Sequence, residues 1–287
     1  MQPRRSALFM PGHNVRAIEK AQTLPADVVI MDLEDAVAAE TKVTARETVL
    51  SQLATGDFGL REVAVRINGS DTEWQTDDLA AFSQAPIQAI VLPKVETHSQ
   101  VRDIGAAMDR LGYAPSVGLW LMAESPAGIL NARGYCRAHP RVQALLLGTS
   151  DLAKGLRVPV SRERSGLLYA LSQAVMVARE AGIDVLDGVS LALDDPEGLR
   201  AECEQGRDLG FDGKTLIHPK QIDIANDVFA PTEATIAQAT AVVEAWAEAR
   251  SRGDGLCVLE GRLIESLHVI EAERVLAVAD AIAKRQA

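Results

Sequence analysis

One pattern recurs eight times along this chain: a short apolar run is followed by a longer amphipathic run. An apolar run of this length is typical of a strand buried on both faces, and the amphipathic run is typical of a helix that covers it. Tandem units of this kind build a parallel sheet, because a helical crossover returns the chain to the edge where the next strand starts. The apolar runs occupy residues 6–10, 28–31, 62–65, 87–92, 117–123, 144–147, 185–186 and 214–217.

Eight such units predict a parallel (β/α)8 TIM barrel, which we assign to residues 1–230 as a catalytic domain. A chain of 287 residues with 47% hydrophobic residues can bury one large core of this kind. The alternative is a doubly wound open sheet, which normally carries a glycine-rich phosphate-binding turn after its first strand. The turn Pro11-Gly12-His13-Asn14 lacks that pattern. The barrel is therefore the favoured fold.

Residues 231–287 follow the last unit and form a C-terminal extension. The sequence predicts helices at 232–250 and 266–284, with a hairpin at 256–264 that turns at Glu260-Gly261. So short a segment is not expected to bury a core of its own, so we expect it to pack on its own barrel or on a neighbouring subunit. In the second arrangement Glu265 would approach the active site of that neighbour.

Charge and composition exclude several classes of partner. Lys and Arg number 29 against 40 Asp and Glu, and the net charge of -11 argues against binding to nucleic acid or to an anionic membrane. No apolar stretch approaches transmembrane length, and the four-residue run before Pro11 is too short for a signal peptide. The three cysteines are widely spaced and lack metal-ligand spacing, which favours reduced thiols in a cytoplasmic protein.

Two neighbouring apolar runs lead to carboxylates, Glu124 and Asp151, and residues that start helices lie beside each of them, Ser125-Pro126 and Thr149-Ser150. At the rim of a sheet two such charges repel unless a cation lies between them, and a hard divalent cation with oxygen ligands is the usual solution. The alternative is that both are helix N-terminal acids stabilised by the helix dipole. In a barrel the chemistry lies at the C-terminal ends of the strands. The polar residues at those ends are Asp32, Glu34, Asp35, Arg66, Asn68, Lys94, Glu124, Asp151, Asp187 and His218.

Several blocks of the chain, in order, resemble the citrate lyase β-subunit and malyl-CoA lyase branch of the HpcH/HpaI aldolase superfamily. They are LFMPGHNVRAIEKA, ADVVIMDLEDAV, VAVRING, IVLPKVE, LMAESPAGILNA, LLLGTSDLA and LEGRLIESLHVIEA. The resemblance covers almost the whole chain. It implies a β/α barrel whose C-terminal extension covers the active site of a neighbouring subunit in a homo-oligomer, a trimer or a hexamer.

The resemblance also implies roles for individual residues. Mg²⁺ would be held by Glu124 and Asp151, with Glu34 and Asp35 behind its water ligands. Arg66 would bind the 2-oxo acid or the developing enolate. Further substrate contacts would come from Phe9, Arg16 and Lys20, which lie where the family meets CoA, and from Thr149 and Ser150.

The acid/base of the family is an aspartate in a Met-Ile-Asp segment of the extension. Here that segment reads Leu263-Ile264-Glu265, and glutamate reaches one methylene further. Because a shift of about 1 Å in a catalytic group can cost about a hundredfold in rate, this difference bears on the reaction.

We therefore expect a Mg²⁺-dependent carbon–carbon lyase that splits a malyl-, citramalyl- or citryl-type 3-hydroxyacyl-CoA into an acyl-CoA and a 2-oxo acid, with thioester hydrolysis as a further possible reaction. One alternative is a metal-dependent aldolase on free 2-oxo acids without CoA. Another is a non-catalytic subunit that binds a CoA ester. A Schiff-base aldolase using Lys94 or Lys214 is the weakest alternative.

Overall fold

The structure is a computed structural model that describes residues 2–286, and it divides into two compact units. The larger unit is Arg4–Phe229. The smaller unit consists, within the described range, of residues 2–3 and 230–286.

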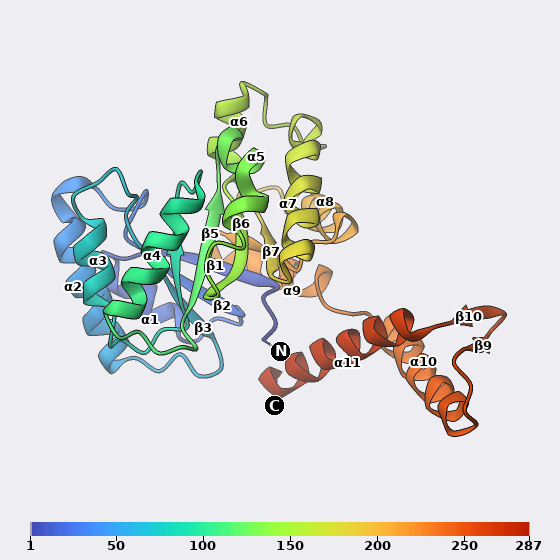
Figure 1. Ribbon diagram of the computed structural model, residues 1–287. Coiled ribbons are helices and arrows are strands. Elements are labelled where there is room, and N and C mark those ends of the chain that lie inside the picture. The colour runs from blue at the N-terminus through green and yellow to red at the C-terminus, as the bar shows by residue number, and fades with distance from the viewer. Residues whose placement is uncertain (1, 287) are drawn as a thin grey trace. The chain divides into compact units, whose positions relative to one another are not determined.

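The larger unit contains a closed barrel of parallel strands, which confirms the predicted TIM barrel (Figure 1). Each strand pairs with the next in sequence order, and the last pairs with the first, for example through Leu8 opposite Leu216. The strands are β1 (Ser6–Pro11), β2 (Val28–Asp32), β3 (Glu62–Arg66), β4 (Ala89–Leu92), β5 (Gly118–Ala123), β6 (Val142–Leu147), β7 (Asp184–Asp187) and β8 (Gly213–Leu216).

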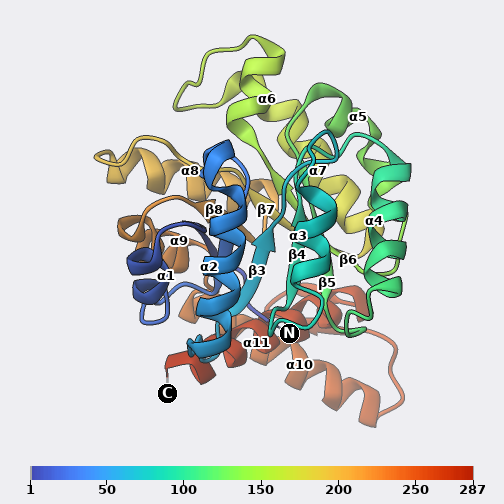
Figure 2. The same ribbon diagram turned by 90° about the vertical axis from the view of Figure 1, so that its left-hand side faces the viewer.

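Helices follow the strands and surround the barrel (Figure 2). Local signals start several of them: Asp195 accepts a hydrogen bond from the backbone N–H of Gly198, and Pro196 occupies the first helical position. The helices are α1 (Val15–Ala21), η1 (Ala39–Thr41), α2 (Lys42–Thr55), α3 (Gln75–Ala81), α4 (His98–Arg110), α5 (Pro126–Tyr135), α6 (Thr149–Leu156), η2 (Ser165–Leu167), α7 (Leu168–Ala181), α8 (Pro196–Leu209), η3 (Pro219–Gln221) and α9 (Ile222–Val228).

Two helical segments differ from what the sequence pattern indicates. The amphipathic pattern after the sixth apolar run extends over residues 162–181, but α7 begins only at Leu168, because Arg164 adopts a left-handed backbone conformation with φ of 49°. The segment after β8 carries two short elements, η3 and α9, whose bounds the sequence pattern did not define. The missed signal was His218-Pro219, where the histidine side chain accepts the backbone N–H of Lys220.

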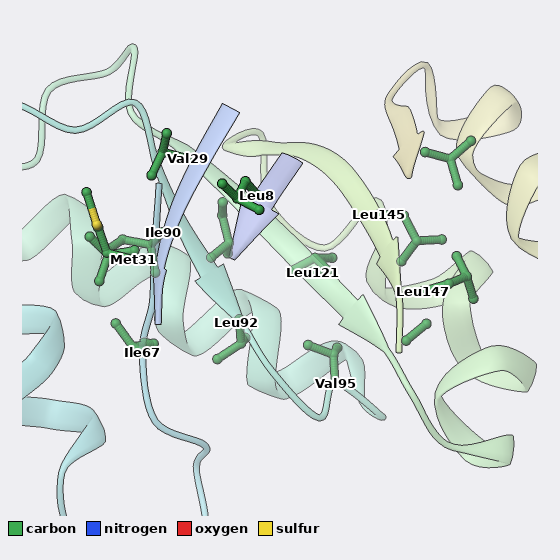
Figure 3. Packing of buried hydrophobic residues seen from close by; sticks show 14 of the residues in the cluster. Leu8, Val29, Met31, Ile67, Ile90, Leu92, Val95, Leu121, Leu145 and Leu147 are labelled. Atoms are coloured by element: carbon green, nitrogen blue, oxygen red, sulfur yellow. The ribbon is translucent and has the colours of Figure 1, made fainter. Parts of the chain in front are cut away.

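Alternation along the strands sorts the core into two layers. One set of side chains points outward and packs beneath the helices, as Leu8, Val29 and Leu121 do in Figure 3. The other set fills the barrel interior and includes Trp120 and Met122. Strands that are buried on both faces account for the nearly continuous apolar runs in the sequence.

Arg4 closes the N-terminal end of the barrel. Its guanidinium donates to both oxygens of Glu62, at 2.8 and 2.7 Å, and to Asp184 at 2.7 Å. It also lies 4.6 Å from the ring centroid of Trp120 inside the barrel. Glu62 and Asp184 begin β3 and β7, so one side chain ties together two strands that are not neighbours in the sheet.

The smaller unit contains α10 (Glu233–Ser251), the hairpin strands β9 (Cys257–Leu259) and β10 (Arg262–Ile264), and α11 (Ser266–Gln286). The hairpin turns at Glu260 and Gly261, both with positive φ, as a tight two-residue turn requires. Contrary to expectation, this unit has a small apolar cluster of its own, whose buried members are Ala239, Val242, Ile264, Val269 and Ala272. No helix in the described part of the chain combines the length and apolar character needed to cross a membrane.

We predict that Arg4→Ala lowers the free energy of unfolding by about 3 kcal/mol, because it leaves the buried carboxylate of Glu62 without its partner. Adding Glu62→Gln should restore part of this loss, since the amide carries no charge. Urea denaturation of the two variants and the wild type measures both effects. An Arg4→Ala variant within about 0.5 kcal/mol of wild type would contradict a structural role for this closure.

Candidate active site

Arg66, the last residue of β3, is held rigidly at the C-terminal end of the barrel. Asp32, at the end of β2, accepts hydrogen bonds from Nε at 2.7 Å and from Nη2 at 2.6 Å. The guanidinium carbon lies 4.8 Å from the ring centroid of Phe9. Burial alone would lower the pKa of Arg66, but the charges of Asp32 and Glu34 outweigh it and raise the pKa above its ordinary value. Arg66 is therefore a cation with a fixed orientation. Its Nη1 faces Glu34 and Asp35.

Glu34 is buried and lies between two cations. Its Oε2 is 3.0 Å from Nη1 of Arg66, and its Oε1 is 2.6 Å from Nζ of Lys94. Neither oxygen makes a hydrogen bond of good geometry, although both are inaccessible to solvent. Burial raises the pKa of Glu34 despite these cations. Asp35, by contrast, is exposed, with Nη1 of Arg66 at 3.4 Å.

Glu124 follows β5 and is 5% exposed. Its Oε1 accepts the backbone N–H of Lys94 at 2.5 Å, and Lys94 adopts a φ of 53°, a conformation uncommon for residues other than glycine. Gly148 lies so close that a side chain there would collide with Glu124. Burial, together with the negative charge of Glu34, raises the pKa of Glu124 to about 7.

Asp151 lies in the first turn of α6, directly after β6. Its side chain is exposed, and its negative charge raises the pKa of Glu124 by less than burial and the charge of Glu34 do. Thr149, the first residue of α6, is buried, and its hydroxyl lies 3.5 Å from the carbonyl oxygen of Val189. Ser150 is exposed.

The donor set suits a cation that keeps part of its water shell. No group of three or more His, Cys, Asp or Glu side chains able to hold a metal ion occurs among residues 2–286. Mg²⁺ does not require one, because it is commonly bound by one or two carboxylates, substrate oxygens and water. The buried oxygens of Glu34 lack well-formed hydrogen bonds, and burial together with the negative charge of Glu34 raises the pKa of Glu124. Both observations indicate a place for additional positive charge.

Other predicted residues lie elsewhere or have structural partners. Arg16 and Lys20 are exposed one turn apart on α1, whereas the ring of Phe9 packs inside the barrel. Glu265 is an exposed residue of the smaller unit, at the junction of β10 and α11. Among the polar strand ends, three have structural roles: Asn68 donates to Asp78, Asp187 pairs with Arg164 and Lys214, and His218 caps η3.

The structure argues against both Schiff-base candidates. Lys214 is fully buried and pairs with Asp187 at 2.9 Å and Glu202 at 3.1 Å. The close contact of the Lys94 ammonium with Glu34 raises its pKa, which is the wrong direction for a nucleophilic amine. Lys94 acts here instead as a link between Glu34 and Glu124. The sequence did not show this link, because it depends on a positive φ at a lysine.

Comparisons with known proteins identify the family that the chain resembles. A family model described as HpcH/HpaI aldolase/citrate lyase matches residues 5–219. A (3S)-malyl-CoA thioesterase of Cereibacter sphaeroides is 47% identical over 98% of this chain and 96% of its own. A citrate lyase subunit beta of Leuconostoc mesenteroides is 36% identical over 97% of this chain and 94% of its own. Among solved structures, this chain is similar to CitE from Mycobacterium tuberculosis in complex with magnesium, acetoacetate and coenzyme A. The TM-score is 0.75 and the sequence identity is 29%, and the match covers 97% of this chain and 98% of that chain.

The pKa of Glu124 predicts how metal-free protein responds to pH. Its folded-state pKa of about 7 lies above the ordinary 4.5, so between these values the folded state retains a proton that the unfolded state has lost. Stability therefore falls as pH rises through this window. In EDTA at pH 8, Glu124→Gln should unfold at a higher temperature than wild type. The gain in unfolding free energy should be roughly 3 kcal/mol, from about 1.4 kcal/mol per pKa unit.

At pH 4.5 the same pair of proteins should unfold at nearly equal temperatures, because Glu124 is then largely protonated in the folded protein and only half ionised in the unfolded chain. Thermal unfolding at the two pH values makes the comparison. An equal difference at both would show that the charge of Glu124 is not the cause.

Proposed function

The chain belongs to the HpcH/HpaI aldolase/citrate lyase family, and on that basis we propose that it is a Mg²⁺-dependent enzyme acting on (3S)-malyl-CoA or a closely similar 3-hydroxyacyl-CoA. The observation that carries the proposal is the placement of a fixed guanidinium, Arg66, among carboxylates at the end of the barrel where active sites lie. The relatives supply the substrate class, since the names of the thioesterase and of the CitE complex include CoA.

The residues that would hold Mg²⁺ are Glu124 and Asp151, with Glu34 and Asp35 acting through water. When bound, the ion supplies positive charge that stabilises negative charge developing on substrate oxygens. Lys94 keeps Glu34 and Glu124 in place through its ammonium and its backbone N–H.

Arg66 would bind the free carboxylate of the malyl group. Asp32 and Phe9 already fix its orientation, so little reorganisation is needed when the substrate arrives. Thr149 and Ser150 would contact the same end of the substrate. Arg16 and Lys20, whose charged groups are exposed on α1, would meet the phosphates of CoA. Because the ring of Phe9 packs inside the barrel, it would contact only the part of the CoA ester that enters the barrel.

We place thioester hydrolysis first among the possible reactions. In it, water adds to the thioester carbonyl, the carbon–sulfur bond breaks, and malate and free CoA thiol leave. The similarity to (3S)-malyl-CoA thioesterases favours it over the carbon–carbon cleavage that the sequence alone ranked first. Cleavage, which yields acetyl-CoA and glyoxylate from the same substrate, is the second candidate because citrate lyase β-subunits are also relatives.

The products formed from (3S)-malyl-CoA distinguish the two reactions. We expect free thiol to appear in a dithiobis-nitrobenzoate assay, without glyoxylate in a phenylhydrazine assay, and excess EDTA to abolish turnover. Glyoxylate without thiol would establish cleavage instead. Turnover of free 2-oxo acids with none of the CoA ester would support the aldolase alternative, and unchanged activity in EDTA would refute the metal requirement.

We further propose that Glu265 is an acid/base that one subunit supplies to its neighbour in a cytoplasmic homo-oligomer. Glu265→Gln should then lower kcat by about a hundredfold to ten-thousandfold with little change in KM, because it keeps the shape and removes the proton carrier. A surface role would leave kcat within about twofold.

Mixing subunits tests the proposed location of Glu265. Inactive Glu265→Gln subunits combined with inactive Glu124→Ala subunits should regain part of the activity, because one interface then holds intact groups from both chains. Each variant alone is the control. No recovery after verified subunit exchange would mean that Glu265 does not act on a neighbour.

A further inference from the structure

The side chain of Asp151 is not held by contacts of its own. No hydrogen bond or ion pair of its carboxylate is recorded in the described part of the chain, and the residue is exposed. Glu124, by contrast, is buried and accepts a backbone hydrogen bond. The position of Asp151 therefore depends on how firmly α6 is attached to the barrel.

The segment that follows α6 is anchored by one buried residue. Every other residue from 154 to 166 is exposed or half-buried, whereas Arg164 is 4% exposed. A left-handed conformation at Arg164 turns its side chain inward at this point of the loop. Its guanidinium donates to both oxygens of Asp187, at 2.8 and 2.7 Å, to Gln205 at 2.7 Å, and to the carbonyl oxygen of Glu202 at 3.2 Å.

These contacts belong to a buried cluster of charges, which we define as Arg164, Asp187, Glu202 and Lys214. Lys214 pairs with both acids, so two positive charges face two negative charges. Burial alone would raise the pKa of Asp187, but Lys214 and Arg164 outweigh it and hold the pKa below its ordinary value. The cluster links the loop after α6 to β7, α8 and β8, and so gives that loop a rigid attachment.

The other end of α6 meets the same region of the barrel. Gly188 follows Asp187, and its backbone N–H donates to that carboxylate at 2.8 Å. A side chain at position 188 would collide with Thr149, so the first residue of α6 packs directly on this turn. The N-terminal end of α6 thus packs on the turn that follows β7, and the loop that follows its C-terminal end is attached to the cluster through Arg164.

We propose that Arg164 is a positioning residue for the metal site: through the buried cluster it fixes α6, and with it Asp151, at the end of the barrel. This inference rests on the proposed role of Asp151 as a metal ligand. Groups that orient a metal ligand without touching the metal commonly change affinity by about 10- to 100-fold when they are removed.

Isothermal titration of the full-length protein with MgCl2 tests the proposal. Arg164→Met should raise the Kd for Mg²⁺ at least about tenfold. It should also speed amide hydrogen exchange in residues 149–164 while leaving β5 unchanged. Arg164→Lys keeps a positive charge beside Asp187, but its ammonium cannot also reach Gln205 and the carbonyl oxygen of Glu202. The Kd of this variant for Mg²⁺ should therefore lie between those of the wild type and Arg164→Met.

Arg141→Met is the matched control. Arg141 is also largely buried, pairs with Asp109 and donates to backbone carbonyls, but it lies at the N-terminal ends of β5 and β6. It should lower the melting temperature without changing the Kd. Gln205→Leu is a second test variant for the case in which Arg164→Met does not fold. It keeps all the cluster charges but removes the contacts of Gln205 to Arg164 and to the carbonyl oxygen of Glu163, so it should also raise the Kd for Mg²⁺.

The outcomes separate this inference from the proposed function. If wild type binds Mg²⁺ and a folded Arg164→Met binds it equally well, the positioning role is refuted while the metal site stands. If Arg141→Met weakens binding as much as Arg164→Met, the effect is general destabilisation and the inference is likewise refuted. If wild type does not bind Mg²⁺ at all, the proposed metal site itself fails.

Discussion

Repulsion among acidic side chains at the C-terminal end of the barrel is the constraint on which the site depends. The strand order brings Asp32, Glu34 and Glu124 to one rim, where burial removes the water that would otherwise screen them. Arg66 offsets part of this charge and is itself fixed by it. Burial, together with the negative charge that remains, raises the pKa of Glu124. A protein selected for stability alone would favour apolar residues at these positions, so the retained acids point to chemistry.

The two proposed metal ligands are held in different ways. Glu124 is rigid because the backbone of Lys94 and the missing side chain at Gly148 define its place. Asp151 is exposed on a short helix and takes its position from that helix. Because of this asymmetry, substitutions around Glu124 would displace that ligand directly, whereas substitutions around Asp151 would displace it by loosening the attachment of α6. The proposed positioning role of Arg164 gives the buried ion cluster a function, since Thr149 packs on the turn at Gly188 directly after Asp187.

The fold was predictable from the sequence because strands buried on both faces read as apolar runs at regular intervals, and the strand ends identified the rim. What the sequence did not show depends on backbone conformation and long-range pairing. The positive φ of Lys94 and of Arg164 cannot be read from residue type, since neither is glycine. The partnership of Asp32 with Arg66 spans 34 positions, and Asp32 was only one of many acids at the strand ends. A helix as short as α9 has too few residues to show the 3.6-residue periodicity of an amphipathic helix.

The smaller unit leaves a large apolar surface uncovered despite its own cluster. Val258, Leu263, Leu267 and Ile270 are each more than half exposed, which is costly in water and typical of a surface that packs on another protein. Two of them, Leu263 and Leu267, flank Glu265 in sequence at the junction of β10 and α11. Burying this apolar surface would therefore carry Glu265 to the surface on which it packs. The same free energy that drives association would then position an acid, so assembly and catalysis would depend on one contact.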